Sequence, residues 1–119
     1  MKERRKDPRI NEENKIVLSP GPGGRRRRSK KVCCCLTRDI SMGGIRVLTN
    51  APFEVGSRLD VELTLTRSKT IVRAVAQVRE VKELSGKNSY DMGLEFAKIS
   101  PADELVLIEH IYGRRGHRA

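Results

Sequence analysis

The segment spanning residues 58–66 constrains the fold most, because apolar and polar side chains alternate along it without a break. Every second position carries a leucine or a valine, and the positions between them carry acidic residues or threonine. Successive side chains of a β-strand point to opposite faces, so this pattern predicts a strand with one face in a core and the other in solvent. A chain of 119 residues can bury one such core, which predicts a single domain.

Further runs with strand-like composition recur at intervals of about ten residues, and clusters of Gly, Pro, Asn and Ser separate them. We predict these additional strands at residues 15–18, 32–37, 45–49, 71–81 and 89–96. Turns are predicted at residues 38–44 and 83–88. Many short strands at even spacing favour an antiparallel barrel, closed or nearly closed.

The hydrophobic period changes after Ser100, where a helix is predicted to follow the last strand and cover one end of the barrel. Ser100 is the expected N-cap, and Pro101 suits the first helical position. Apolar residues then recur at spacings of three and four, at Leu105, Ile108 and Ile111 or Tyr112. This face is predicted to pack on the barrel, and Gly113 is expected to end the helix. The predicted fold class is therefore all-β with one C-terminal helix.

Positive charge is concentrated near the N-terminus. Residues 1–31 contain 12 Lys and Arg against 4 Asp and Glu, whereas residues 32–119 contain 13 against 11. The basic excess predicts that the N-terminal quarter meets an anionic partner, such as a nucleotide, a nucleic acid or an acidic lipid. A solvated basic tail without a partner is the simpler alternative.

Composition divides the chain into three parts. Residues 1–12 are charged and nearly free of apolar side chains, so we predict a flexible basic arm. Residues 13–113 are the predicted barrel and helix, and within them residues 20–31 are rich in Pro, Gly and Arg and are predicted to be a mobile basic loop. Residues 114–119 are a predicted tail.

No stretch of about 18 apolar residues is present, so no transmembrane helix is predicted. The first residues, from Met1 to Lys6, are mostly charged and lead into no apolar segment of the kind that a secretory signal has. A cytoplasmic location is the resulting expectation.

Residue types that serve catalysis and metal binding are scarce. His110 lies on the predicted helix and His117 in the tail, and we interpret both as surface or helix-end histidines. The cysteines are adjacent, at positions 33–35, which suits neither a disulfide nor a metal cage because neighbours on a strand point apart. We interpret them as reduced and partly buried, and we predict no metal site, no cofactor and no enzymatic activity.

Two short motifs remain as candidates for ligand binding. The first is Arg5-x-x-x-Arg9, whose arginines offer planar forks of donors that match phosphate and the acceptor edge of guanine. Pro8 pushes Asp7 to an extended conformation, so the arm is expected to be extended or turned and able to wrap over a ligand. A basic tail of this kind is common, so the motif is weak evidence on its own.

The second motif is the predicted turn that contains Asp39, Ser41, Gly43 and Gly44. Asp39 and Ser41 can bond nearby backbone groups and shape the turn, and Asp39 can accept hydrogen bonds from the N1–H and N2–H₂ edge of a guanine. The two glycines permit positive φ and a close approach of a ligand to the backbone. A well-formed β-turn without a ligand is the alternative interpretation.

The two motifs, in this order and at this spacing, resemble the PilZ domain family. The resemblance extends to the sequence Asp-Met-Gly-Leu-Glu-Phe at residues 91–96, which is similar to the end of that family's last barrel strand before its C-terminal helix. It covers residues 3–112, almost the whole chain. It implies a six-stranded antiparallel β-barrel that acts as a receptor for the bacterial second messenger cyclic di-GMP.

The resemblance also implies roles for single residues. Arg5 and Arg9 would grip phosphates and guanine Hoogsteen edges, and the residues of the second motif would line the guanine and phosphate site. In this family an arginine at the place of Arg4 goes with a stacked ligand dimer. The complete predicted site is Arg4, Arg5, Arg9, Asp39, Ser41, Gly43 and Gly44, and the further candidate contacts are Arg46, Arg73 and Arg79.

In the predicted mechanism, ligand binding orders the arginine arm on the barrel, and the ordered arm presents a new face to a downstream protein that the sequence does not identify. The main alternative is a binder of nucleic acid or of an acidic surface, acting through the basic loop from Arg25 to Lys31. With two Phe, two Tyr and no Trp, the chain has few stacking platforms, which disfavours nucleic acid. A ligand-free adaptor that only docks on a partner protein is a third interpretation.

Overall fold

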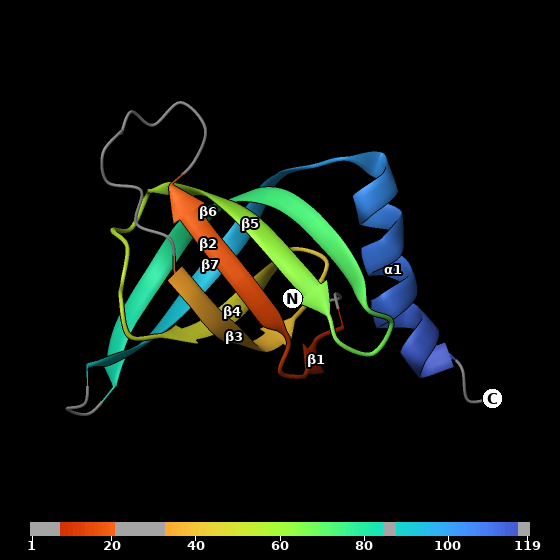
Figure 1. Cartoon of the computed structure of the whole chain (residues 1–119), viewed down its shortest axis with the longest axis horizontal. Coiled ribbons are helices and arrows are strands. Elements are labelled where there is room, and N and C mark those ends of the chain that lie inside the picture. Colours follow the sequence, from red (N-terminus) through yellow and green to blue (C-terminus); the bar gives the residue numbers. More distant parts are fainter. Residues whose placement is uncertain (1–7, 21–32, 85–87, 117–119) are drawn as a thin grey trace, which may run out of the picture.

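The computed structural model describes residues 8–20, 33–84 and 88–116, which form seven strands and one helix (Figure 1). The elements are β1 (Ile10–Asn11), β2 (Lys15–Pro20), β3 (Cys33–Ile40), β4 (Gly44–Thr49), β5 (Arg58–Leu65), β6 (Thr70–Leu84), β7 (Ser89–Ile99) and α1 (Pro101–Gly116). The strands predicted from the sequence are all present, as β2 to β7.

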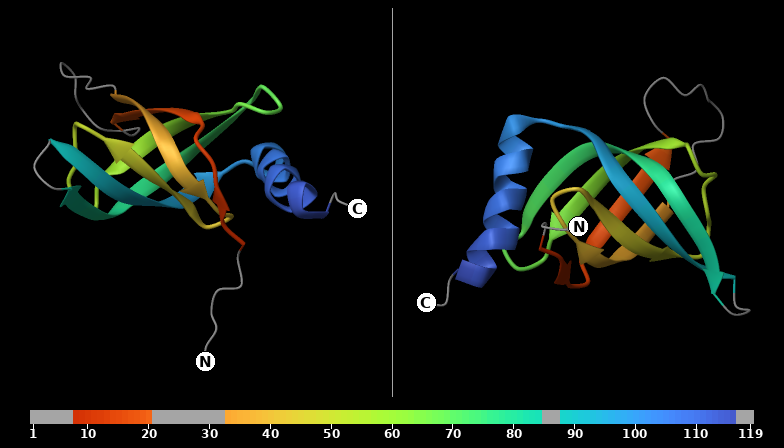
Figure 2. Two further views of the ribbon diagram at one scale, coloured as in Figure 1. Left: turned by 90° about the horizontal axis from the view of Figure 1, so that it is seen from below. Right: turned by 180° about the vertical axis from the view of Figure 1, so that it is seen from behind.

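The six longer strands close into an antiparallel barrel. Their order is β3–β2–β5–β6–β7–β4, and a ladder between β4 and β3 joins the two ends. Closure pairs the strand edges that an open sheet would leave exposed. Figure 2 shows the barrel from two further sides, with α1 at one end. The predicted fold class, an all-β six-stranded antiparallel barrel with a C-terminal helix, is confirmed.

The core consists of side chains that point into the barrel. On β5 they are Leu59, Val61, Leu63 and Leu65, each at most 3% exposed, so the alternation that predicted this strand is confirmed. Each fully buried aliphatic side chain stabilises the fold by roughly 1.5–3 kcal/mol relative to exposure. This core fixes the strands and therefore the positions of the polar residues on the outer face of the barrel.

The strands that surround the second motif differ from the prediction. β3 continues to Ile40, so Arg38 and Asp39 are strand residues and the turn to β4 is confined to residues 41–43. The extension follows from pairing on both sides, because β1 lies along one side of this segment and β4 along the other. Tertiary pairing of this kind overrides the turn preference of residues such as Asp.

β1 lies inside the segment that was expected to be a flexible arm, and it continues the line of β2. Ile10 pairs with Ile40, and Lys15 pairs with Leu36, so both strands run antiparallel to β3 along the same side of it. The first described residues, which precede Ile10, therefore lie beside the β3–β4 turn. Apart from Pro20 at the end of β2, the predicted mobile loop at residues 20–31 lies outside the described residues.

Helix α1 begins as predicted but packs by a different face. Ser100 caps it by accepting a hydrogen bond from the Asp103 amide at 3.1 Å. Leu107 and Ile111 are fully buried, whereas the exposed apolar residues are Leu105, Ile108 and Tyr112. The predicted packing face was therefore wrong except at Ile111. The reason is that apolar residues occupy two faces of this helix, and their spacing alone does not say which face meets the barrel.

The helix also extends to Gly116, past the end predicted at Gly113. Glycine weakens a helix interior by only about 1 kcal/mol, so it ends a helix reliably only where the following chain cannot continue it. Among residues 8–20, 33–84 and 88–116, no helix is long and apolar enough to cross a membrane.

Candidate ligand-binding site

The turn between β3 and β4 is built around Ser41. The Ser41 amide donates to the Gly44 carbonyl at 2.9 Å, and the Ser41 hydroxyl accepts from the Gly43 amide at 3.3 Å. The Phe96 amide on β7 donates to the Gly43 carbonyl at 2.9 Å, which ties the turn to the neighbouring strand. Ser41 is only 5% exposed. It therefore shapes the turn as predicted, from a largely buried position.

Gly44 sits where β4 and β7 approach each other closely. A Cβ atom at this position would collide with the Leu94 carbonyl oxygen and would lie 3.1 Å from the Glu95 Cα. Among the described residues, the glycine with positive φ is Gly56, so Gly43 and Gly44 do not use the positive φ that glycine permits. The backbone of β7, and not a left-handed turn, is the reason that this position needs a glycine.

Arg9 and Asp39 bring the two predicted motifs together. Their side chains form an ion pair in which Nη1 lies 3.1 Å from Oδ1, although the residues are 30 positions apart. The Arg9 side chain is 55% exposed and the Asp39 side chain 16%. An ion pair with one exposed partner contributes about 0–1 kcal/mol to stability, so another anion or donor can replace either partner at little cost.

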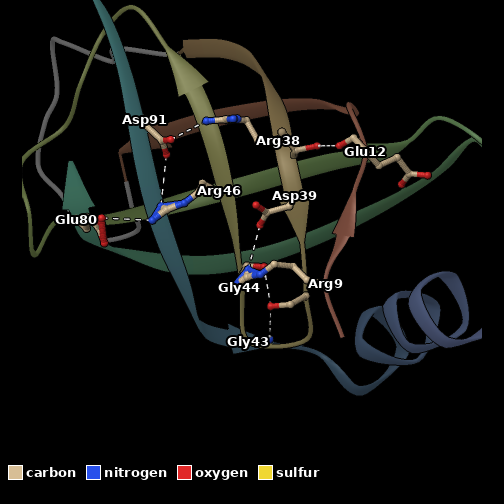
Figure 3. A network of polar contacts seen from close by, with 11 residues as sticks. Arg9, Glu12, Arg38, Asp39, Gly43, Gly44, Arg46, Glu80 and Asp91 are labelled. Carbon is tan, nitrogen blue, oxygen red and sulfur yellow. Dashed lines mark hydrogen bonds and ion pairs between the residues drawn. The ribbon is translucent and has the colours of Figure 1, made fainter. Parts of the chain in front are cut away.

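Figure 3 shows this ion pair among the neighbouring polar contacts. A hollow of about 490 Å³ opens beside it. The predicted site residues in its lining are Arg9, Asp39, Ser41, Gly43 and Gly44. The other two predicted residues, Arg4 and Arg5, lie outside the described residues. The remaining wall comes from β4, β6 and β7, and its residues are Ile45, Arg46, Arg79, Gly93, Leu94 and Glu95.

Arg46 forms one wall of the hollow and is held by carboxylates on both sides. Its guanidinium lies 3.4 Å from Oδ1 of Asp91 and 3.3 Å from Oε2 of Glu80 (Figure 3). Asp91 also binds Arg38, at 2.8 Å. The guanidinium rests over Gly93, where a Cβ atom would come within 3.1 Å of Nη1. The glycine in the sequence of residues 91–96 therefore leaves room for this arginine.

Of the other two candidate strand arginines, one lines the hollow and one does not. Arg79 lines the hollow and pairs with Glu95 at 3.2 Å. Arg73 lies six positions earlier on β6, pairs with Glu62 on β5 at 2.9 Å, and does not line the hollow. Six residues of strand span about 20 Å, which explains why Arg73 is not at the site.

The site therefore joins an arginine before the barrel to a glycine-rich turn and to two strand arginines. A family model, that of the PilZ domain, matches residues 3–113. The chain belongs to the PilZ domain family. No curated protein matches it.

Solved structures with the same fold as this PilZ domain include three of particular interest. The inhibitor of motility MotI/DgrA from Bacillus subtilis has a TM-score of 0.77 and 20% identity, over 98% of this chain and 53% of that one. The PilZ domain of YcgR from Escherichia coli with c-di-GMP has a TM-score of 0.68 and 20% identity, over 98% and 95%. The K. pneumonia MrkH–c-di-GMP complex has a TM-score of 0.68 and 17% identity, over 98% and 55%. The chain spans about half the length of MotI/DgrA and of MrkH.

The PilZ domain has a second and slightly larger hollow, of about 550 Å³, on the outer face of β3 and β4. Leu36 and Leu48, which face each other across the ladder, form part of its floor. Its lining includes one arginine, Arg38, and two glutamates, Glu12 and Glu13. A phosphate ligand would meet more negative than positive charge there, so the hollow that contains Arg9 is the better candidate.

The cysteines of the PilZ domain are free thiols. Cys33 is buried and Cys35 partly buried, as expected, but Cys34 is exposed. Burial, together with the neighbouring Cys33, raises the pKa of Cys35 to about 12, so this thiol stays protonated and unreactive at neutral pH. In the part of the chain that the structure describes, no group of three His, Cys, Asp or Glu side chains is arranged to hold a metal.

His110 corrects the interpretation of the histidines. Its side chain is 6% exposed, and Nε2 lies 2.7 Å from Oε1 of Glu12. A surface or helix-end histidine is therefore the wrong description of this residue. The sequence carries no local signal for the contact, because the partners are 98 positions apart. His117 lies outside the described residues.

Proposed function

We propose that this PilZ domain is a receptor that binds cyclic di-GMP in the hollow beside the β3–β4 turn. The observation that carries the proposal is the meeting of Arg9 with Asp39 and Ser41, which are distant in the chain but line one surface. The choice of ligand is supported by the family and by the solved structures of YcgR and MrkH, which are described with c-di-GMP.

Each lining residue has a role in this proposal. Arg9 binds a phosphate or the Hoogsteen edge of a guanine through its planar fork of donors. Asp39 accepts hydrogen bonds from the N1–H and N2–H₂ edge of a guanine. For both to reach the ligand, the ion pair between them opens: the exposed Arg9 side chain can swing into solvent, and the guanine edge supplies new donors to Asp39. Gly43 and Gly44 line the hollow, and the missing side chain of Gly44 lets β4 lie close against β7 there.

The charges around the hollow call for additional cations. The charged residues of the lining are three arginines and two carboxylates, and Glu80 and Asp91 further neutralise Arg46. A ligand with two phosphates gains little net attraction from this set. We therefore assign Arg5 and Arg4, which precede Pro8 in the chain, to the same site.

Ligand binding orders the N-terminal arm on the barrel in this proposal. Fixing the backbone of one residue costs about 1–2 kcal/mol, and a charge-assisted hydrogen bond contributes about 1.5–3 kcal/mol. Several such bonds are required, which explains why both motifs have to act together. The ordered arm then presents a new face to a downstream protein. Arg4 favours binding of the ligand as a stacked dimer, and the proposed function needs no catalytic step.

Calorimetric titration with cyclic di-GMP at low salt tests the proposal and also measures the ligand-to-protein ratio. We expect binding by the wild-type protein and its loss in the variants Arg5→Ala and Arg9→Ala, with the melting temperature unchanged. Arg73→Ala is the matched control, because this arginine pairs with Glu62 away from the hollow. Absence of heat from the wild type at high micromolar ligand would refute the receptor function.

A further inference from the structure

A buried polar contact joins the N-terminal segment to α1. Nε2 of His110 lies 2.7 Å from Oε1 of Glu12, and the two side chains are only 6% and 16% exposed. Because an ionised carboxylate can only accept hydrogen bonds, the imidazole donates from Nε2. The contact therefore links the segment that carries Arg9 to the last element of the chain.

The barrel holds the same glutamate from other directions. The Thr37 hydroxyl on β3 donates to the Glu12 carbonyl at 2.7 Å, and Nδ2 of Asn14 donates to the Glu12 carboxylate at 3.0 Å. Asn14 is itself fixed, because its Oδ1 accepts from the Thr66 amide at 2.9 Å. Contacts from β3, from α1 and, through Asn14, from the end of β5 thus make Glu12 an anchor.

Arg9 lies three positions before this anchor, at the far end of a short ladder. β1 is two residues long and pairs with Ile40 and Asp39 of β3. A ladder of this length has little stability of its own. Its register on β3 depends on the next fixed point, which is Glu12, whose amide donates to the Arg38 carbonyl at 3.2 Å.

We propose that His110 is a positioning residue of the ligand site, which holds Glu12, fixes the register of residues 9–11 on β3, and thereby couples the hollow to α1. The ligand-dependent part of this inference rests on the proposed binding of cyclic di-GMP. Coupling between two sites is reciprocal. Because α1 stabilises residues 9–12 on β3, a ligand that binds Arg9 stabilises the contact of these residues with α1 in return.

The first test needs no ligand and measures hydrogen exchange at the Glu12 amide. In the variant His110→Ala we expect this amide to exchange about tenfold faster, because local opening of the segment becomes easier. His110→Gln should restore slow exchange, since its side-chain amide can donate to the same carboxylate. Tyr112→Ala, on the exposed side of the same helix, is the matched control and should leave the exchange rate unchanged.

The second test measures cyclic di-GMP affinity by calorimetry. We expect His110→Ala to weaken binding about fivefold, at the lower end of typical couplings between sites, and His110→Gln to recover most of the loss. Glu12→Gln should also weaken binding. The double variant of Glu12→Gln and His110→Ala should be no weaker than the worse single variant, because two residues that act through one contact are not additive.

Two outcomes would overturn the inference. One is unchanged exchange at Glu12 in a folded His110→Ala variant, and the other is equal acceleration in Tyr112→Ala, which would indicate general loosening of the helix. If His110→Ala does not fold, Glu12→Gln replaces it, because this change weakens the same contact and should accelerate exchange in the same way. Failure of the wild type to bind cyclic di-GMP refutes the proposed function alone, since the exchange experiment still decides the role of His110.

Discussion

Two polar regions lie at the two ends of residues 9–12, and they are built in opposite ways. At the hollow, Arg9 meets Asp39 in an ion pair whose arginine is 55% exposed. At the helix, Glu12 meets His110 in a contact where neither side chain is more than 16% exposed. The Asp39 and Glu12 carboxylates are equally buried, at 16% exposed, so the difference lies in their partners. The exposed Arg9 guanidinium can leave at little cost, whereas the buried His110 imidazole and the Asn14 amide hold Glu12 in place. We call the surroundings of Arg9 and Asp39 the replaceable region, because their ion pair can exchange partners. We call the surroundings of Glu12 and His110 the fixed region.

The largest effect is expected from a substitution in the β3–β4 turn region, which forms one side of the hollow. Gly44→Ala should destabilise the fold by about 3 kcal/mol, because its methyl group meets the backbone of β7 and not a yielding side chain. Urea unfolding measures the loss. Gly113→Ala is the control, since a Cβ there meets nothing within 4 Å, and it should stabilise the helix by up to about 1 kcal/mol. Equal effects of the two changes would contradict the explanation.

The fixed region is tested next by removing one of its buried hydrogen-bonding groups. Asn14 is 1% exposed and bonds both Thr66 and Glu12, so Asn14→Ala should cost about 2 kcal/mol of unfolding free energy. The exposed Asn50 offers a matched substitution, Asn50→Ala, for which we expect a change within about 0.5 kcal/mol. Similar losses for both variants would show that the buried cluster is not an anchor.

The replaceable region should respond to substitution more in binding than in stability. Arg46→Gln is expected to lower cyclic di-GMP affinity about tenfold, equivalent to about 1.4 kcal/mol, because the guanidinium lines the hollow beside the turn. Its unfolding free energy should fall by no more than about 1 kcal/mol, because its two ion pairs are partly exposed. Arg73→Gln, outside the hollow, should leave both quantities unchanged. An Arg46 variant with wild-type affinity would remove this residue from the site.

A smaller effect is expected at Arg38, which pairs with Asp91 on the outer face. Arg38→Gln should lower stability by about 0.5 kcal/mol at low salt, and the difference should shrink as salt screens the pair. Unfolding curves of variant and wild type at low and high ionic strength measure it. If the loss of unfolding free energy does not depend on salt, the pair of Arg38 and Asp91 is shielded from solvent like the contact of Glu12 with His110.

The smallest effect on nucleotide binding is expected from deletion of residues 21–31, which include the basic run from Arg25 to Lys31. Cyclic di-GMP affinity should stay within about twofold, whereas any binding of DNA or acidic vesicles that falls steeply with salt should be lost. A large loss of cyclic di-GMP affinity would assign these arginines to the ligand site. The basic run would then serve nucleotide binding and would no longer support a separate function.

The parts of the fold that could be predicted are those whose signal is local. Alternation at Leu59, Val61, Leu63 and Leu65 reports burial directly, and Ser100 followed by Pro101 marks a helix start by its own hydrogen bonding and geometry. The C-terminal end of β3 could not be predicted, because Asp39 is favoured in turns. Arg38 and Asp39 become strand residues only through their neighbours β1 and β4.

The candidate site shows the same division. Arg9, Asp39, Ser41 and Gly44 were identified by motif, and the structure brings them together. The need for glycine at position 44 could not be predicted, because the backbone that a Cβ would meet belongs to Leu94, 50 residues further along the chain. The contact of Glu12 with His110 had no signal in either local sequence. Only the closed barrel and the helix packed at its end make the two residues neighbours.

The end-to-end arrangement of β1 and β2 along β3 imposes a parity rule on the chain. Strand side chains alternate between two faces, so one residue inserted between Arg9 and Glu12 would turn the arginine away from the hollow. Two inserted residues would restore the facing but displace the arginine by about 7 Å along β3. For anyone who grafts this arm onto another barrel, the number of residues between arginine and anchor therefore matters as much as their identity.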